Sequence, residues 1–489
     1  MSEPTVPHDP QQPDQPEQPE HPDPDAAPPE QEPEKAPLLA LREPMPSVVE
    51  TPEALEAVCE AVAGGTGPVA IDAERASGYR YSNRAYLIQL RREGSGTHLV
   101  DPIAFDGLAP LQEAIGDAEW ILHAATQDLP CLRDEGLSPT ELFDTELAGR
   151  LLGYPRVGLA TLVETLLGRR MKKEHSAVDW STRPLPKPWL EYAALDVEVL
   201  VELRDLLAAE LEETGKAEWA RQEFDALRGF EPTPRVDAWR RTSGLHKVRG
   251  RRSLGAVKAL WELRDSLAEQ RDVTPGRIIP DSAITVAATH MPTDKGALLG
   301  LKGFHGRGAE RYSSRWVSTL REVAELPEDE LPTRAPRSDG PPTPRAWGDR
   351  DPVAARRLQH AREAMTALAE EHSMPAEQLL TPDFMRRTLW APPRTRDPQA
   401  LALAHVPLET NRPVARLLQF QGQAACAVLG AQEDERGGAI LASEEAAEEI
   451  GLAVLRDRIE GVIDGGSRGG ISQFHYVWLF QKIVGQPAN

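Results

Sequence analysis

The segment that decides the fold, residues 68–74, has the sequence PVAIDAE. Its first four residues are apolar, and a short apolar run of this kind predicts a buried β-strand. Because successive side chains of a strand point to opposite faces, Asp72 and Glu74 project from the same face. The segment therefore predicts a buried strand that presents two neighbouring carboxylates on one face.

Further strands and then helices are expected after this segment. Apolar runs at residues 85–90, 97–100 and 120–123 predict three more strands. Strands early and helices late predict a sheet covered by helices, an α/β domain over residues 46–230. Helical periodicity places the helices of this domain at residues 142–152, 159–167 and 189–211.

The length of 489 residues predicts about three domains. Residues 1–45 are acidic and rich in proline, which predicts a disordered tail. Two helical blocks, a proline-rich linker and a C-terminal tail without an evident role follow the α/β domain. Their predicted bounds are 240–326 for the first helical domain, 327–350 for the linker, 351–432 for the second helical domain and 433–489 for the tail.

The two helical blocks contain a faint internal repeat. Residues 267–281, from LAEQ to a Pro-Asp pair, are echoed by LAEE and a Pro-Asp pair at residues 368–383, if a short gap is allowed. A repeat of this length favours two copies of one small helical fold. Chance similarity between helices rich in Ala and Leu is the alternative.

The net charge of −22 is distributed unevenly. Residues 246–321 hold about fourteen Lys and Arg against about seven Asp and Glu. The chain is acidic in net charge but contains a basic module, whose positive charge a phosphate backbone attracts.

The cysteine spacing and the length of the apolar runs indicate the cellular compartment. Cys59, Cys131 and Cys426 lie far apart without a CxxC spacing, which disfavours a zinc site and suits a reducing cytoplasm. The apolar runs stop short of a membrane span, and the N-terminus lacks the pattern of a secretory signal. We therefore expect a cytoplasmic protein that does not associate with membranes.

Two more acids complete a set of four that suits phosphodiester hydrolysis. Asp128 follows the strand expected at 120–123, and Asp196 lies one helical turn after Tyr192. Two divalent cations about 3.5–4 Å apart can stabilise in-line attack on an anionic phosphorus. Mg²⁺ prefers oxygen ligands, so carboxylates suffice to hold it. A tyrosine beside a ligand can hold the attacking water or help to deprotonate it.

Each of these signals is common in proteins without such chemistry. An Asp-x-Glu pair after a strand is usually a surface turn, and an Asp that opens a helix is usually a cap. A Tyr and an Asp one turn apart on a helix are most often an exposed, hydrogen-bonded pair. The combination, in this order within one α/β segment, favours a nuclease site.

The same motifs resemble those of a known family. Residues 71–74, 123–128 and 192–196 resemble the three exonuclease motifs of the DEDD superfamily, in its tyrosine-containing branch. Over about residues 50–215 the chain is similar to the ribonuclease D family. This similarity rests on YLIQL at 86–90, VDP at 100–102, FDT at 143–145, GLATL at 158–162, DWSTRPL at 179–185 and YAALDV at 192–197.

The resemblance implies a ribonuclease H-like exonuclease domain, with a mixed sheet and flanking helices. It implies a 3′→5′ exoribonuclease that holds two Mg²⁺ or Mn²⁺ ions and releases 5′-mononucleotides from RNA 3′ ends, including transfer-RNA precursors. One departure is Arg75, where relatives often carry an aromatic or apolar residue. The roles carried over are metal ligation by Asp72, Glu74, Asp128 and Asp196, and positioning of the attacking water by Tyr192.

The basic helical block resembles the HRDC domain, and the second block resembles a tandem module of the same family more faintly. The HRDC resemblance rests on the turn at 275–281 and on LKGFHG at 301–306. A tight glycine turn before a helix exposes N–H groups that can meet a phosphate. A solvated basic face is the alternative. The predicted RNA-binding residues are Lys302, Gly303, Arg307, Arg311 and Arg315, together with Gln89, which the sequence leaves equally open as a buried structural amide.

The sequence thus predicts a 3′→5′ exoribonuclease followed by two all-α HRDC-like domains. Its expected partner is RNA with a free 3′ end, and no obligate protein partner is expected. A DNA-directed 3′→5′ exonuclease of the same superfamily and a non-catalytic RNA-binding scaffold are the alternatives. Because all four acids and the tyrosine are present, the sequence favours an active enzyme.

Overall fold

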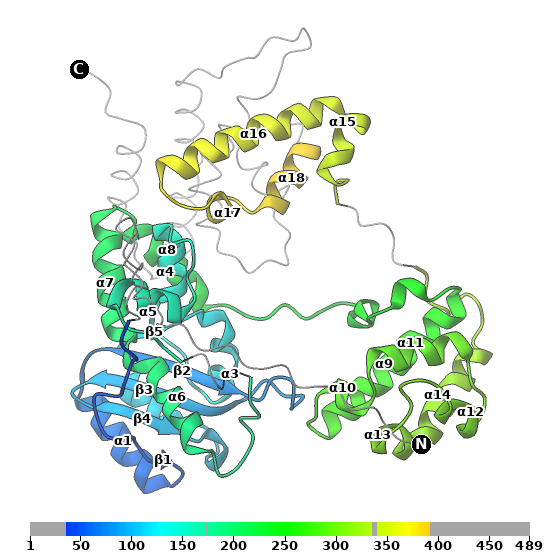
Figure 1. Ribbon diagram of the computed structural model, residues 1–489, viewed down its shortest axis with the longest axis horizontal. Helices are drawn as coiled ribbons and strands as arrows, with labels where there is room; N and C mark the ends of the chain where they lie inside the picture. The colour runs from blue at the N-terminus through cyan, green and yellow to red at the C-terminus, as the bar shows by residue number, and fades with distance from the viewer. Residues whose placement is uncertain (1–35, 173–174, 176, 335–339, 392–489) are drawn as a thin grey trace, which may run out of the picture.

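The structure of the chain is a computed structural model that describes residues 36–172, 175, 177–334 and 340–391. Figure 1 shows an α/β unit, a helical unit that contains α9 to α14, and a second helical unit that contains α15 to α18. The predicted disordered tail up to residue 35 lies outside the described residues. The end of the second helical domain beyond residue 391 and the tail at 433–489 also lie outside them.

The α/β unit is built on a six-stranded mixed sheet with the order β1-β4-β3-β2-β5-β6. The catalytic candidate strand β2 lies inside the sheet, antiparallel to β3 and parallel to β5. The predicted mixed sheet with flanking helices is confirmed. The strands are β1 (Val48–Val49), β2 (Thr66–Arg75), β3 (Ala85–Glu93), β4 (Gly96–Val100), β5 (Glu119–Leu122) and β6 (Glu141–Asp144).

Helices cover both faces of this sheet. One face of β2 and β3, which includes Ile71 and Ile88, packs in one core with α1 (Pro52–Gly64) and α2 (Ala109–Ile115). The opposite face packs against the α6 and α7 side. The remaining helices of this unit are α3 (Leu129–Asp134), α4 (Thr145–Leu152), α5 (Leu159–Leu167), α6 (Lys187–Glu198), α7 (Leu200–Glu213) and α8 (Ala217–Arg228).

Two sequence predictions in this unit are corrected. Residues 142–144, expected to be helical, belong to strand β6, and α4 begins only at Thr145 because the Asp144 side chain caps it by accepting from the Leu147 N–H. Residues 36–45, assigned to the disordered tail, pack on the domain. Leu39 is buried, and its N–H donates to the Arg170 carbonyl, so this apolar residue has both a core contact and a backbone partner.

The two helical units share one local plan, which explains the sequence repeat. The long helices α9 (Arg251–Gln270) and α16 (Pro352–Glu371) both have 20 residues, and their first residues are 101 positions apart. The following short helices, α10 (Pro275–Ile278) and α17 (Ala376–Leu379), keep the same offset. The remaining helices are α11 (Asp281–His290), α12 (Lys295–Leu299), α13 (Arg307–Arg311), α14 (Ser313–Glu325), α15 (Trp347–Arg350) and α18 (Pro382–Trp390).

The linker between the helical units is shorter than expected. Residues 344–346 form a 3₁₀ turn, and α15 follows at once, so the predicted linker at 327–350 ends before residue 344. The reason is Trp347, which is fully buried and donates its indole N–H to the Pro342 carbonyl at 2.8 Å. A buried aromatic side chain holds this proline-rich stretch in the fold.

The second helical unit contacts the α/β unit directly. The Lys216 ammonium is buried and donates to the Leu151 carbonyl at 2.8 Å and to the Ser373 carbonyl at 3.4 Å. Met374 and Leu379 belong to the main core of the α/β unit. Apolar packing and a buried ammonium together hold the two units against each other.

The first helical unit is tied to the loop that follows β2, which reaches toward α10 in Figure 1. The Asp272 carboxylate accepts from the backbone N–H groups of Tyr81 at 3.1 Å and Ser82 at 2.8 Å, and from the Tyr86 hydroxyl at 3.3 Å. The Tyr81 hydroxyl donates to Asp265 at 3.0 Å. We call this set of contacts the Asp272 clasp.

None of the helices in the described part of the chain combines the length and the apolar character that crossing a bilayer requires.

Substitution Asp272→Ala tests the Asp272 clasp. Removal of the carboxylate leaves the Tyr81 and Ser82 N–H groups without their acceptor, so we expect their amide hydrogens to exchange about tenfold faster. Hydrogen exchange with peptide mass spectrometry measures this. Asp265→Asn, which affects only the Tyr81 hydroxyl, is the control and should leave the Ser82 amide unchanged. If the Ser82 amide exchanges at the same rate in Asp272→Ala as in the native chain, Asp272 does not hold this loop.

Candidate active site

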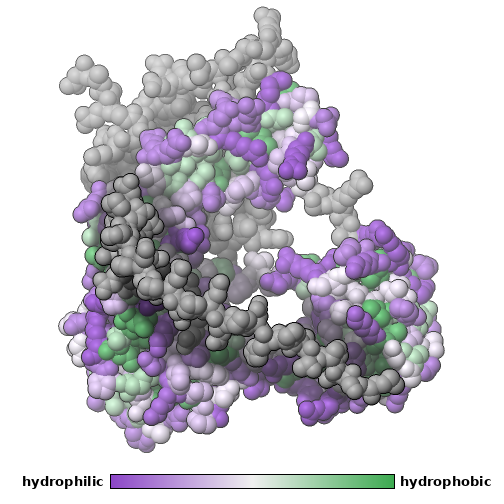
Figure 2. Space-filling view, in the orientation of Figure 1, coloured by the Kyte–Doolittle hydropathy of each residue, from purple (hydrophilic) through white to green (hydrophobic). Residues whose placement is uncertain are grey.

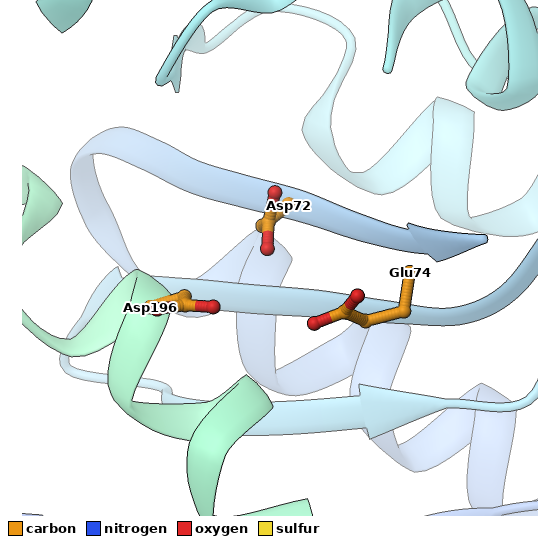
Figure 3. A group of neighbouring side chains, drawn as sticks. All are labelled: Asp72, Glu74 and Asp196. Atoms are coloured by element: carbon orange, nitrogen blue, oxygen red, sulfur yellow. The ribbon is translucent and has the colours of Figure 1, made fainter. Parts of the chain in front are cut away.

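Strand β2 and helix α6 bring three carboxylates to one point. Alternation along β2 directs Ala70 toward the Val197 side of α6, and Asp72 and Glu74 follow on the same face. Ligand oxygens of Asp72, Glu74 and Asp196 all lie within 4.8 Å of one another. Figure 3 shows the three carboxylates directed toward a common space, two from the strand and one from the helix.

Helix α6 is fixed on the sheet by small apolar residues and by a buried ion pair. Ala193 and Ala194 are fully buried, which allows the helix to approach the strands closely. Glu198 is buried two residues after Asp196, and it pairs with the Arg91 guanidinium of β3 at 3.3 Å. The Thr97 hydroxyl of β4 also donates to Glu198, at 3.2 Å. Sequence reasoning missed this anchor, and its signal was a charged residue within an otherwise buried helical turn.

Asp128 enters from a third element, the turn between β5 and α3. This residue is 4% exposed. The turn begins at Ala124, in the left-handed region at φ 61°, and is held by Asp144, which accepts from the N–H groups of Ala124 at 3.2 Å and Ala125 at 2.8 Å. The Asp128 carboxylate is close to Arg75, whose guanidinium nitrogen lies 3.6 Å away. Asp128 therefore adjoins the three-carboxylate group but is paired with a cation of the chain.

These acids are like charges that lie close together in a poorly solvated site. Burial raises the pKa of Glu74 well above its usual range, and the charges of Asp72, Asp196 and Asp128 raise it further. The pKa of Asp128 and that of Asp196 are also raised well above the usual range, first by burial and then by Asp72. Closely spaced oxygens with unneutralised charge fit a hard divalent cation.

Tyr192 lies one turn before Asp196 on α6, and its hydroxyl is hydrogen-bonded to the Asp196 carboxylate. Burial raises the pKa of the Tyr192 hydroxyl far above its usual value, and the charges of Asp196, Glu74 and Asp72 add to the rise. The phenol therefore keeps its proton at neutral pH. It can orient a water by hydrogen bonding.

Gln89 is fully buried on β3 directly opposite Asp72 in the strand register. Neither its amide oxygen nor its amide nitrogen has a hydrogen-bond partner in the described structure. Directly paired residues of antiparallel strands share one face, so the Gln89 amide lies on the same face of the sheet as the Asp72 carboxylate. The amide is buried, but its two polar atoms lack the partners that a structural amide has, so both alternatives for Gln89 stay open.

The predicted RNA-binding residues of the first helical unit lie outside the acid group, on another domain. Gly303 has a φ of 93°, and a Cβ there would stand 2.9 Å from the Ala283 Cβ, so the turn needs glycine. Figure 2 shows hydrophilic side chains along the border of this unit. The four exposed cations of the predicted set are Lys302, Arg307, Arg311 and Arg315.

Comparison with known proteins decides the family. Residues 46–212 match the family model described as 3′-5′ exonuclease, residues 253–320 match the HRDC domain, and residues 340–407 match the 3′ to 5′ exonuclease C-terminal domain. Ribonuclease D of Acidiphilium cryptum (strain JF-5) is 34% identical over 312 residues, which cover 61% of this chain and 78% of that protein. The chain belongs to the ribonuclease D family.

Other relatives agree with this assignment. Ribonuclease D of Escherichia coli (strain K12) is 31% identical over 300 residues, which cover 58% of this chain and 76% of that protein. A solved structure of a Bifidobacterium adolescentis protein matches with a TM-score of 0.73 and 34% identity, covering 81% of this chain and 100% of that one. The structure of E. coli RNase D matches with a TM-score of 0.58 and 25% identity, covering 78% and 98% of the two chains.

This ribonuclease D family member is a 3′→5′ exoribonuclease, a hydrolase that acts on RNA and depends on divalent metal. The predicted exonuclease and HRDC folds are confirmed by the family models. The non-catalytic scaffold is thereby set aside.

Substitution Asp72→Asn tests the charge crowding. Because the variant lacks one of the repelling charges, we expect its nuclease domain in a chelating buffer at pH 7 to melt about 2 °C higher than that of the native chain. It should gain less from added Mg²⁺, since one carboxylate of the acid group is lost. Differential scanning calorimetry measures both effects, and Asp117→Asn, at an exposed acid, is the control. A lower melting temperature in chelator would contradict the crowding.

The raised pKa values of Glu74, Asp128 and Asp196 also set a pH dependence. A folded carboxyl with a raised pKa binds protons more tightly than the unfolded one. In chelator, the contribution of these three carboxyls to stability should therefore fall as the pH rises from about 4, the unfolded carboxyl value, toward the folded pKa values. His123, whose pKa burial lowers to about 4, contributes with the opposite sign over the same interval, with or without metal. Urea unfolding at several pH values measures the slope, which Mg²⁺ should flatten. A slope in chelator that is no more negative than the slope in Mg²⁺ would refute the prediction.

Proposed function

We propose that this ribonuclease D family member removes 5′-mononucleotides one at a time from RNA 3′ ends by a two-metal-ion reaction. Asp72, Glu74, Asp128 and Asp196 would hold two divalent cations, Mg²⁺ or Mn²⁺. The observation that carries this proposal is the convergence of acids from strand β2, helix α6 and the turn before α3 on one poorly solvated spot. Such convergence is unfavourable for acids that hold no cation.

The cations would neutralise charge on the phosphate and polarise the attacking water. The chain's own groups supply the geometry. The Glu198–Arg91 pair fixes the axial position of α6, and thereby of Asp196. The Asp144 carboxylate fixes the Asp128 turn by accepting from two of its N–H groups. Rigid placement of this kind lowers the cost of aligning water and phosphate.

Tyr192 would hold the attacking water in line with the phosphorus. Its hydroxyl keeps its proton because burial and three neighbouring acids raise its pKa. It therefore acts as a hydrogen-bonding group toward the water oxygen. Tyr192 is accordingly proposed as a group that positions the attacking water.

We further propose that the RNA body lies along the first helical unit, beside Lys302, Gly303, Arg307, Arg311 and Arg315. Four of these residues are exposed cations, which suits contacts with phosphates that do not depend on sequence. Transfer-RNA precursors and other structured RNAs with a free 3′ end are the proposed substrates. The solved E. coli relative is described as an exoribonuclease involved in structured RNA processing.

The cytoplasm is the proposed compartment, because Cys59 and Cys131 are free thiols that suit a reducing environment. No obligate protein partner is part of the proposal.

Substitution Tyr192→Phe tests the mechanism on a transfer RNA extended at its 3′ end. Loss of the hydroxyl should slow single-turnover release of mononucleotides about 100-fold, while Mn²⁺ binding stays within about twofold. Tyr154→Phe, whose hydroxyl binds Glu210 away from the site, is the matched control. Products are identified by chromatography, and a matched single-stranded DNA tests the DNA-directed alternative. Oligonucleotide products, or equal cleavage of DNA, would overturn the proposed reaction.

The double substitution Lys302→Ala and Arg307→Ala tests the RNA path. Removal of two phosphate contacts should weaken RNA binding and reduce the slope of log affinity against log salt by about 1 to 2. Binding is measured in Ca²⁺ by fluorescence anisotropy over a salt series. Lys258→Ala, a basic residue of the same unit paired with Glu262, is the control. An unchanged slope would assign these residues to a solvated basic face.

A further inference from the structure

Arg75 occupies an unusual place directly after the second acid of β2. Regular alternation would direct it away from Glu74, but the β2–β3 register shifts at this step. Glu74 pairs with Leu87 and Arg75 with Ala85, so Tyr86 has no partner on β2. Such an irregularity re-aims the side chains beside it. The Arg75 guanidinium reaches the Asp128 carboxylate at 3.6 Å.

Arg75 supplies a positively charged side chain beside the four acids. Among the ion pairs of the described residues, its pair with Asp128 is the one that involves any of the four proposed ligands. The positive charge of Arg75 opposes the rise in the pKa of Asp72, Glu74 and Asp128 that burial causes. The Arg75 side chain is 25% exposed, whereas the Asp128 side chain is 6% exposed. Arg75 therefore bridges the buried acids and the solvent.

Two of its possible partners exclude each other. A guanidinium at the Asp128 oxygen and a divalent cation on the same carboxylate repel each other, so each weakens the binding of the other. A phosphate offers the planar guanidinium two anionic oxygens that can accept from its paired N–H donors. Under the proposed function, the anion that enters this site is the phosphate of the 3′-terminal nucleotide.

We propose that Arg75 exchanges partners during substrate binding, from Asp128 to the phosphate of the 3′-terminal nucleotide. This inference rests on the proposed function, because it takes Asp128 to be a metal ligand. Arg75 then competes with the metal for Asp128 when phosphate is absent and binds the phosphate when it is present. Since binding free energies are reciprocal, the phosphate tightens metal binding and the metal tightens phosphate binding.

The test uses the full chain, Mn²⁺ as the metal and adenosine 5′-monophosphate as a phosphate probe that is not hydrolysed. Isothermal titration gives the Mn²⁺ affinity with and without the nucleotide. For the native chain, the nucleotide should tighten Mn²⁺ binding about tenfold. In Arg75→Gln, Mn²⁺ alone should bind roughly tenfold tighter than to the native chain, and the nucleotide should tighten Mn²⁺ binding several-fold less than it does in the native chain.

Matched variants separate the outcomes. Arg84→Gln, which removes a nearby arginine paired with Glu135, should behave as the native chain does. Arg75→Lys should retain part of the coupling, because it keeps the charge but loses the planar geometry. If Arg75→Gln binds Mn²⁺ alone no tighter than the native chain, or keeps the full nucleotide effect, the exchange is overturned.

The proposed function has its own control in the same experiment. Asp128→Asn should lose much of the Mn²⁺ affinity if Asp128 is a ligand. Unchanged affinity in this variant would contradict the proposed ligand set itself. If Asp128→Asn loses Mn²⁺ affinity as expected but Arg75→Gln leaves it unchanged, only the exchange of partners by Arg75 is overturned, and the proposed ligand set stands.

Discussion

Mutual repulsion of buried carboxylates is the constraint on which the rest of this structure depends. Asp128 and Asp196 are 4% and 9% exposed, and burial is the main cause of the raised pKa of both. Left to themselves, such groups separate or take up protons. The protein holds them together with rigid elements from three parts of the chain. The unfavourable energy of that arrangement becomes affinity when a divalent cation neutralises it.

Two of those elements, α6 and the Asp128 turn, are held by polar anchors. Glu198 and Arg91 bind α6 to β3, and Asp144 caps both the Asp128 turn and the start of α4. These anchors are buried ion pairs and charge-assisted hydrogen bonds, which are costly to break when one partner is removed. The geometry of the acids therefore depends on residues that do not belong to the proposed ligand set.

The two helical units contact the nuclease domain at different elements of that domain. The Asp272 clasp holds the loop that leaves the end of β2, and so it lies a few residues from Glu74 and Arg75. Lys216 and Met374 tie the second unit to α4 and α8. On the proposed RNA path, the Asp272 clasp would connect the helical unit that holds the RNA to the loop after the strand that carries Asp72 and Glu74.

The sequence by itself determined the local features: the apolar strand that ends in Asp72 and Glu74, the one-turn spacing of Tyr192 and Asp196, and the repeat of the helical units. These follow from strand and helix periodicity, which neighbouring residues set. The strand at 141–144, the packing of residues 36–45 and the early end of the linker at Trp347 were missed, because distant partners stabilise them. Only the tertiary structure decided that Arg75 meets Asp128 and that Gln89 is buried opposite Asp72. Register shifts and contacts across the sheet bring these side chains together, and no local pattern of residues encodes them.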